Sequence, residues 1–232
     1  MRLLGYIYEM NFLSHFYFDR NTPNANIVLG TILPDLLKNA NKSWNAHPEK
    51  HPELFDKTGL DQLLQGWQRH LKVDLLFHSS DFFNNKTQAL KQLLIPILKD
   101  SPVRPSFLAH IGVELLLDHL LIEHQKISIS SFYDSLEAVK EEDLTNFLQE
   151  CRVDDTELFF KFFNSFKSSR YLLSYQKLEN ISYALQRICM RLWERPFTEK
   201  TTSDLTSVLE FYKNQLEIDF MVIFEEIEVR LT

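Results

Sequence analysis

Histidines and carboxylates recur at helical spacing in the first half of the chain. His70, Asp74, His78 and Asp81 are spaced four, four and three residues apart. At ~100° per residue these side chains project within about 80° of one another, so one helical face carries two imidazoles and two carboxylates. Divalent metal ions take these groups as ligands in proteins. The pattern predicts metal chemistry, although charged residues at this spacing are also common on solvent-exposed helical faces.

A second pattern of the same kind follows. His110, Glu114 and Asp118 repeat the four-residue spacing, and His119 comes directly after them. Most residues between 115 and 122 are Leu or Ile, so the helix should be largely buried. A buried Asp118 and His119 must be paired or ligated, because an unpaired charge in the interior costs several kcal/mol. Two interpretations stay open: a metal site between facing helices, or a hydrogen-bonded structural His–Asp pair.

Histidine is confined to one half of the chain. All eight histidines lie at or before His124. This asymmetry puts the chemistry in the first half and predicts that the second half is a cover, an oligomer interface or a partner surface. Cys151 and Cys189 lie in that second half and form no Cys-x-x-Cys pair. They indicate buried thiols in a reducing compartment rather than a zinc site.

Composition and periodicity predict an all-α fold. Only 5 Gly and 8 Pro leave little material for the tight turns of an all-β protein. Helical periodicity covers nearly the whole chain, so we expect a single helical domain over 1–232. The clearest helices are predicted over 58–83, 107–125 and 205–231. Another is expected to begin at Pro23 and run towards Leu33, where Pro34 would bend or end it.

Charge and hydropathy exclude several classes of partner. The formal net charge of -7 argues against a broad basic face for duplex nucleic acid. No stretch reaches the roughly 18 uninterrupted apolar residues of a spanning helix. The start of the chain has no small-residue cleavage site of the kind that ends a signal peptide. We therefore expect a cytoplasmic protein with neither nucleic-acid nor membrane partners. The apolar face of the C-terminal helix leaves a homodimer open.

Four motifs in the first half resemble those of the acyl carrier protein phosphodiesterases. Residues 10–15, Met-Asn-Phe-Leu-Ser-His, resemble the family's Met-Asn-Phe-Leu-x-His opening, and residues 30–35 resemble its Gly-Asn-x-Leu-x-Asp segment. Residues 66–74 are similar to its Gly-x-x-x-His-Arg-x-Ile-Asp block, and residues 118–121 to its Asp-His-Phe-Leu. The motifs occur in the family's order. The alignment at Met10 indicates that residues 1–9 are an extension, or that translation starts at Met10.

The resemblance implies a fold, a reaction and a set of site residues. It implies a helical bundle related to the HD-type metal phosphohydrolases, with a catalytic core over 10–124 and a helical cover over 125–232. The implied reaction is hydrolysis of the phosphodiester that joins 4'-phosphopantetheine to a serine of acyl carrier protein, with Mn²⁺ or Mg²⁺. Carried over by position, the metal ligands would be Asp35, His70, Asp74 and Asp118. His15 and His119 would be catalytic, as general acid for the leaving serine oxygen or as a holder of phosphate.

The chain also departs from the family pattern. Leu71 stands where the family has Arg after the histidine of the third motif, and His78-Ser79 replaces a Thr-Asp pair. Glu114 stands where the family often has Asp, and the pattern does not require His78 or His110. Two alternatives follow: an HD-like hydrolase of another small phosphoester, or a scaffold without activity that serves as a helical binding protein.

The implied partner constrains the surface of the protein. Acyl carrier proteins are acidic, whereas this chain has a net charge of -7. A local basic patch would therefore have to dock the partner. The candidates for that patch are Lys38, Lys42, Lys50, Arg69 and Lys72.

Overall fold

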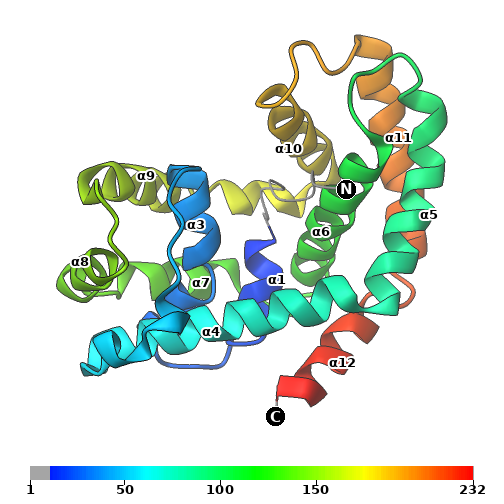
Figure 1. Ribbon diagram of the computed structural model, residues 1–232. Coiled ribbons are helices and arrows are strands. Elements are labelled where there is room, and N and C mark those ends of the chain that lie inside the picture. Colours follow the sequence, from blue (N-terminus) through cyan, green and yellow to red (C-terminus); the bar gives the residue numbers. More distant parts are fainter. Residues whose placement is uncertain (1–10, 232) are drawn as a thin grey trace. The chain divides into compact units, whose positions relative to one another are not determined.

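The computed structural model describes residues 11–231, which form helices without any strand (Figure 1). The prediction of an all-α fold is confirmed. Met10, the first residue of the first motif, lies outside the described residues. The helices of the first half are α1 (Phe12–Tyr17), α2 (Ala25–Gly30), α3 (Leu33–Ala40), η1 (Pro48–Lys50), η2 (Pro52–Phe55), α4 (Thr58–Ser79), α5 (Asp81–Ile97) and α6 (Pro105–Glu123). Those of the second half are α7 (Ile129–Glu137), α8 (Glu141–Glu150), α9 (Thr156–Ser169), η3 (Tyr171–Gln176), α10 (Leu178–Met190), α11 (Glu199–Leu216) and α12 (Met221–Leu231).

These helices form two compact units. The first unit contains the described residues up to Ser14, Leu76–Lys126 and those from Leu172 onward. The second contains His15–Leu75 and Ile127–Tyr171. Each unit thus combines segments from both halves of the chain. The division into a catalytic core over 10–124 and a cover over 125–232 stays a prediction.

The first unit is built around α6. Of the 19 residues of this helix 13 are buried, because it packs against both α5 and α10, and α11 covers α5 in turn (Figure 1). By length and hydropathy α6 is the one helix among the described residues that could cross a membrane. Its apolar window is 72% buried inside the protein, as in the core helix of a globular fold. The three polar residues Glu114, Asp118 and His119 of this helix are buried with it.

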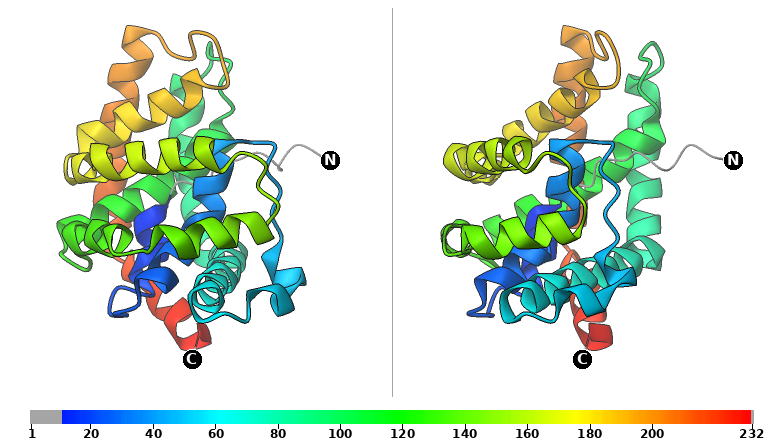
Figure 2. Two further views of the ribbon diagram at one scale, coloured as in Figure 1. Left: turned by 90° about the vertical axis from the view of Figure 1, so that its left-hand side faces the viewer. Right: turned by 60° about the vertical axis from the view of Figure 1, so that its left-hand side comes forward.

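The second unit places short helices around aromatic contacts. Within it α2 packs on α7, and α3 packs on α9, which Figures 1 and 2 show from different sides. The ring of Phe147 on α8 packs against Phe55 and Trp67. The indole Nε1 of Trp44 donates a 2.6 Å hydrogen bond to Asp154. These contacts fix the loop after α3.

Several element boundaries differ from the predicted ones for local reasons. The helix predicted over 58–83 ends at Ser79, because the Ser80 side chain accepts a hydrogen bond from the Phe83 amide and so caps a new helix, α5. Pro34 does not end a helix but lies in the first turn of α3, where a missing N–H costs nothing. The helix predicted over 205–231 is divided into α11 and α12. Cys151 and Cys189 are both free thiols, and only Cys189 is fully buried.

Candidate metal centre

Two glycines bring α2 of the second unit into backbone contact with α4, the helix that carries His70. Gly30 ends α2, and Gly66 lies in α4 one turn before His70. A Cβ atom on Gly30 would lie 2.4 Å from the carbonyl oxygen of Leu63, and one on Gly66 would lie 2.2 Å from that of Ile27. Cβ atoms do not approach backbone oxygens so closely, so only glycine permits this spacing. The motif glycines thus set the distance between α2 and α4.

The imidazole of His70 is oriented through this contact. Its Nδ1 lies 2.9 Å from the carbonyl oxygen of Thr31, the residue directly after Gly30. A carbonyl oxygen only accepts, so Nδ1 carries the proton and donates, and in the neutral ring Nε2 is then the atom with the lone pair. Nε2 lies 3.8 Å from Oδ1 of Asp35. A ring N–H that donates to a backbone carbonyl is the arrangement that orients a metal-binding histidine.

His15 and Asp35 complete a buried group of three ligands in the second unit. His15 lies on α1 and Asp35 in the first turn of α3. The rings of His15 and His70 stack with their centroids 4.1 Å apart and their planes 19° apart. One ligand atom from each of His15, Asp35 and His70 lies within 4.8 Å of the other two. None of the three residues is more than 5% exposed.

The donor set of this group suits a divalent metal ion. Two imidazole nitrogens and one carboxylate oxygen are ligands that first-row transition metals accept, and three protein ligands leave positions open for water and substrate. A buried carboxylate also needs a compensating charge. We call these three residues the first ligand group. Metal binding is therefore the chemistry that its composition and burial favour.

Asp118 has a different role in the structure, as an anchor for the segment before His15. Its Oδ1 accepts hydrogen bonds from the amide and the hydroxyl of Ser14, at 2.7 and 2.6 Å. Its Oδ2 accepts one from the Leu13 amide at 3.2 Å. The predicted burial of Asp118 is confirmed, with 0% exposed. Its partners are these three donors rather than His119, and it lies outside the first ligand group.

The burial of Asp118 predicts a pH-dependent stability. Desolvation raises the pKa of this carboxyl group from 3.8 to about 7, although the hydrogen bonds from Ser14 and Leu13 lower it. The folded state then binds a proton that the unfolded state releases, so the stabilising contribution is complete below pH 4 and is lost as the pH rises through 7. Between pH 5 and pH 7 the free energy of unfolding should fall by about 2 kcal/mol through this group.

Asp118→Asn should remove that dependence. Urea unfolding of the chelator-treated proteins at pH 5 and pH 7 measures the difference between wild type and variant at each pH. The difference between the free energies of unfolding of wild type and variant should change by about 2 kcal/mol between the two pH values. If this difference were the same at both pH values, Asp118 would keep an ordinary pKa in the folded protein.

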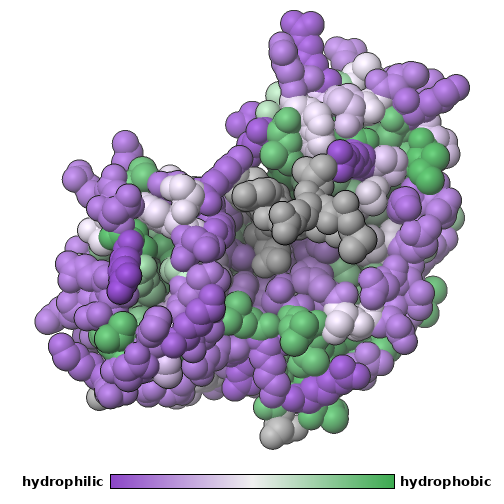
Figure 3. All heavy atoms as spheres, viewed as in Figure 1, coloured by the Kyte–Doolittle hydropathy of each residue, from purple (hydrophilic) through white to green (hydrophobic). Residues whose placement is uncertain are grey.

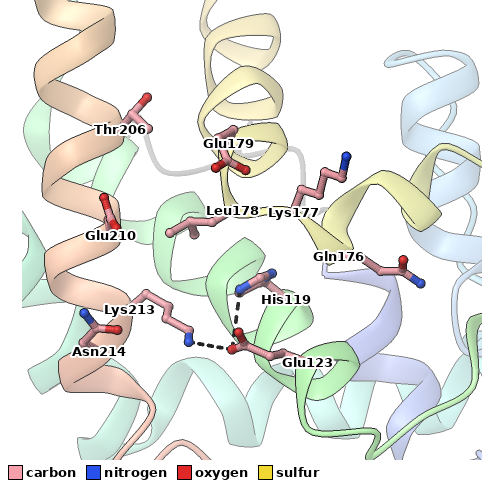
Figure 4. Close-up of a pocket in the computed structure, with 10 residues that line it drawn as sticks. All are labelled: His119, Glu123, Gln176, Lys177, Leu178, Glu179, Thr206, Glu210, Lys213 and Asn214. Carbon is pink, nitrogen blue, oxygen red and sulfur yellow. Dashed lines mark ion pairs between the residues drawn. The ribbon is translucent and has the colours of Figure 1, made fainter.

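His119 opens on a polar pocket of the first unit. Its Nδ1 donates a 2.7 Å hydrogen bond to the carbonyl oxygen of Tyr175, so Nε2 is the atom left to accept or deliver a proton. Figure 4 shows the side chains of His119, Glu123 and Lys213 pointing toward one another across this pocket. Nε2 of His119 lies 3.7 Å from Glu123, and Nζ of Lys213 lies 2.6 Å from the same carboxylate. The cavity has a volume of about 330 Å³.

The six predicted site residues therefore divide into two sets. The structure brings His15, Asp35 and His70 together. Asp74, half-buried one turn further along α4, lies outside that group, as do Asp118 and His119. The roles of all six stay predictions. Sequence reasoning gave no role to the Thr31 carbonyl; the glycine before it in the second motif was the one signal of a close backbone approach.

The comparisons with known proteins agree with the four motifs. The model of the acyl carrier protein phosphodiesterase family matches residues 10–227 of the 232. No curated protein and no solved structure matches the chain significantly. The family match extends far beyond the motifs into the helices of the second half. The chain belongs to the acyl carrier protein phosphodiesterase family.

Proposed function

We propose that this chain is a metal-dependent phosphodiesterase that releases 4'-phosphopantetheine from holo-acyl carrier protein. The observation that carries this proposal is the convergence of three family motifs on one buried group. His15 ends the first motif, Asp35 ends the second and His70 lies in the third, and their ligand atoms lie within 4.8 Å of one another. A sequence that had kept the fold but lost the chemistry would have no need to retain such a group in its interior.

The ligands favour one of the two expected ions. Mg²⁺ prefers an all-oxygen environment, whereas Mn²⁺ accepts imidazole more readily. We therefore favour Mn²⁺, held by His15, Asp35 and His70. When bound, such an ion polarises phosphoryl oxygens and lowers the pKa of a coordinated water. Asp74 stays a proposed further ligand through the family motif.

The protein residues then supply orientation and proton transfer. The hydrogen bond from His70 Nδ1 to Thr31 directs the Nε2 lone pair into the group. Asp35 balances positive charge there. Since the ring of His15 belongs to the ligand group, His119 stays our candidate for the general acid, through the family motif that contains it. Its Nδ1 is already committed to Tyr175, so its Nε2 would carry the proton that the departing serine oxygen requires.

Basic residues of the second unit suit an acidic partner. Lys38 follows Asp35 by one turn on α3, and Arg69 and Lys72 flank His70 on α4. Lys38 and Lys72 are exposed. Leu71, which replaces the family's Arg, is 40% exposed and Leu75 is 68% exposed. Hydrophobic residues are visible over this part of α4 in Figure 3. We propose that the partner docks on this mixed basic and apolar surface, where charge sets the rate of encounter.

The test is incubation of the purified protein with holo-acyl carrier protein and Mn²⁺. We expect conversion of the carrier protein to its apo form, followed by mass spectrometry, and no conversion in EDTA. A generic phosphodiester, bis(p-nitrophenyl) phosphate, serves as the comparison substrate. Cleavage of that compound without cleavage of the carrier protein would favour the small-phosphoester alternative. No cleavage of either, with a melting temperature that Mn²⁺ leaves unchanged, would favour the scaffold without activity.

A further inference from the structure

A second group of metal-ligand side chains lies in the first unit and shares no member with the first ligand group. His78 is the penultimate residue of α4, and His110 and Glu114 lie one turn apart on α6. One ligand atom from each lies within 4.8 Å of the other two. We call these residues the second ligand group. Eight residues, or just over two helical turns, separate His78 from His70 along α4.

The two imidazoles of this group are directed at one carboxylate oxygen. Nε2 of His110 lies 3.1 Å from Oε1 of Glu114, and Nε2 of His78 lies 3.7 Å from the same atom. Two ligand atoms on one tetrahedral zinc ion are about 3.4 Å apart, given metal–ligand distances near 2.05 Å. The observed separations lie on either side of this value. Both nitrogen–oxygen separations are thus close to those around one ion, and the ligand atoms of the two histidines lie within 4.8 Å of each other.

Aromatic packing holds the two rings in this arrangement. The imidazoles of His78 and His110 are stacked, with centroids 4.8 Å apart and planes 18° apart. The buried ring of Phe83 meets both nearly edge-on, with centroid distances of 4.9 and 5.0 Å. Both histidine side chains are about one-fifth exposed, at 23% and 22%. The group is therefore pre-oriented and still open to solvent on one side.

The burial of Glu114 favours a cation at this place. Glu114 is 0% exposed, and neither of its carboxylate oxygens accepts a hydrogen bond from the described residues, although both imidazoles lie within ion-pair distance. A buried carboxylate without donors is costly. A single cation bound by both rings and the carboxylate would compensate this buried negative charge.

We propose that His78, His110 and Glu114 bind a first-row transition metal ion of the Zn²⁺ class. Two imidazole nitrogens favour Zn²⁺, Co²⁺ or Fe²⁺ over Mg²⁺ and Ca²⁺, which prefer oxygen ligands. Three protein ligands leave one position for water. The ion joins the end of α4 to the middle of α6. The site shares no residue with the first ligand group or with His119.

Cobalt titration of the chelator-treated protein tests the site. Wild type is compared with Glu114→Gln, His110→Gln and His51→Gln, the last being a matched change at an exposed histidine. Glu114→Gln and His110→Gln should each bind one equivalent of Co²⁺ fewer than wild type, with loss of the corresponding visible absorption. His51→Gln should match wild type. Because only a difference in stoichiometry is measured, failure of the proposed hydrolysis would leave this result unchanged.

Thermal unfolding separates a bound ion from a plain ion pair. At 100 times the dissociation constant, Zn²⁺ should raise the melting temperature of wild type by about 5–10 °C through this site, and Glu114→Gln should lack that increment. The conservative His110→Gln variant, at a partly exposed position, guards against misfolding of the buried variant. The proposal is overturned if both variants bind as much Co²⁺ as wild type, or if they differ from it only in stability without metal.

Discussion

His70→Gln is expected to lower kcat/KM for holo-acyl carrier protein by at least ~10³-fold, or about 4 kcal/mol of transition-state stabilisation. His70 is the residue of the first ligand group whose orientation the structure defines most fully, by the bond from Nδ1 to Thr31 and the 3.8 Å approach of Nε2 to Asp35. Glutamine can still donate to the Thr31 carbonyl but offers only an amide oxygen in place of the imidazole lone pair. The loss should therefore fall on metal binding rather than on folding.

The assay compares Mn²⁺ dependence as well as rate. His51→Gln again serves as the control, because that histidine is exposed in the loop after η1. The variant should require a higher Mn²⁺ concentration for half-maximal activity, while its melting temperature in EDTA stays within a few degrees of wild type. A His70→Gln enzyme with wild-type kcat/KM and metal dependence would refute the assignment of this group as the metal centre.

Spacing and motifs were enough to name six candidate residues, but not to select the three of them that the structure brings together. Asp74 shares a helical face with His70, and Asp118 follows the same four-residue pattern on α6, so periodicity treats them alike. What separates them is tertiary: the oxygens of Asp118 are directed at the amides of Leu13 and Ser14. No local pattern encodes a contact between residues more than 100 positions apart.

Tertiary contacts also decide the second ligand group, but here they bring together residues to which the sequence gave no common function. Helical spacing alone placed His78 and His110 among polar faces, whereas the family pattern gave them no function. Their meeting at Glu114 depends on how the end of α4 packs on α6, and the α4 boundary depends on a cap at Ser80. The all-α class was predictable because few glycines and a helical period apply along the whole chain. The helix boundaries were not predictable, since single capping hydrogen bonds decide them.

Gly66→Ala is expected to lower the free energy of unfolding by about 3 kcal/mol, the second large effect that the structure predicts. In an isolated helix the same change would stabilise by about 1 kcal/mol, because alanine has the higher helix propensity. Here the added methyl group would lie 2.2 Å from the carbonyl oxygen of Ile27 and 2.7 Å from the Cα of Gly30. Both atoms belong to the backbone and cannot rotate away, so α2 and α4 must separate. Overpacking of this kind destabilises the fold by more than the higher helix propensity of alanine stabilises it.

Gly112→Ala is the matched control for that prediction. Gly112 is also a buried helical glycine, but its Cβ would meet only the side chains of Leu90, at 3.0 Å, and Leu185, at 3.9 Å. Side chains can adjust, so this variant should stay within about 1 kcal/mol of wild type in urea unfolding. Separation of α2 from α4 would also move the Thr31 carbonyl away from His70. Gly66→Ala should therefore weaken Mn²⁺ binding together with stability. A Gly66→Ala variant as stable as wild type would show that the close approach of the two helices does not depend on this pair of glycines.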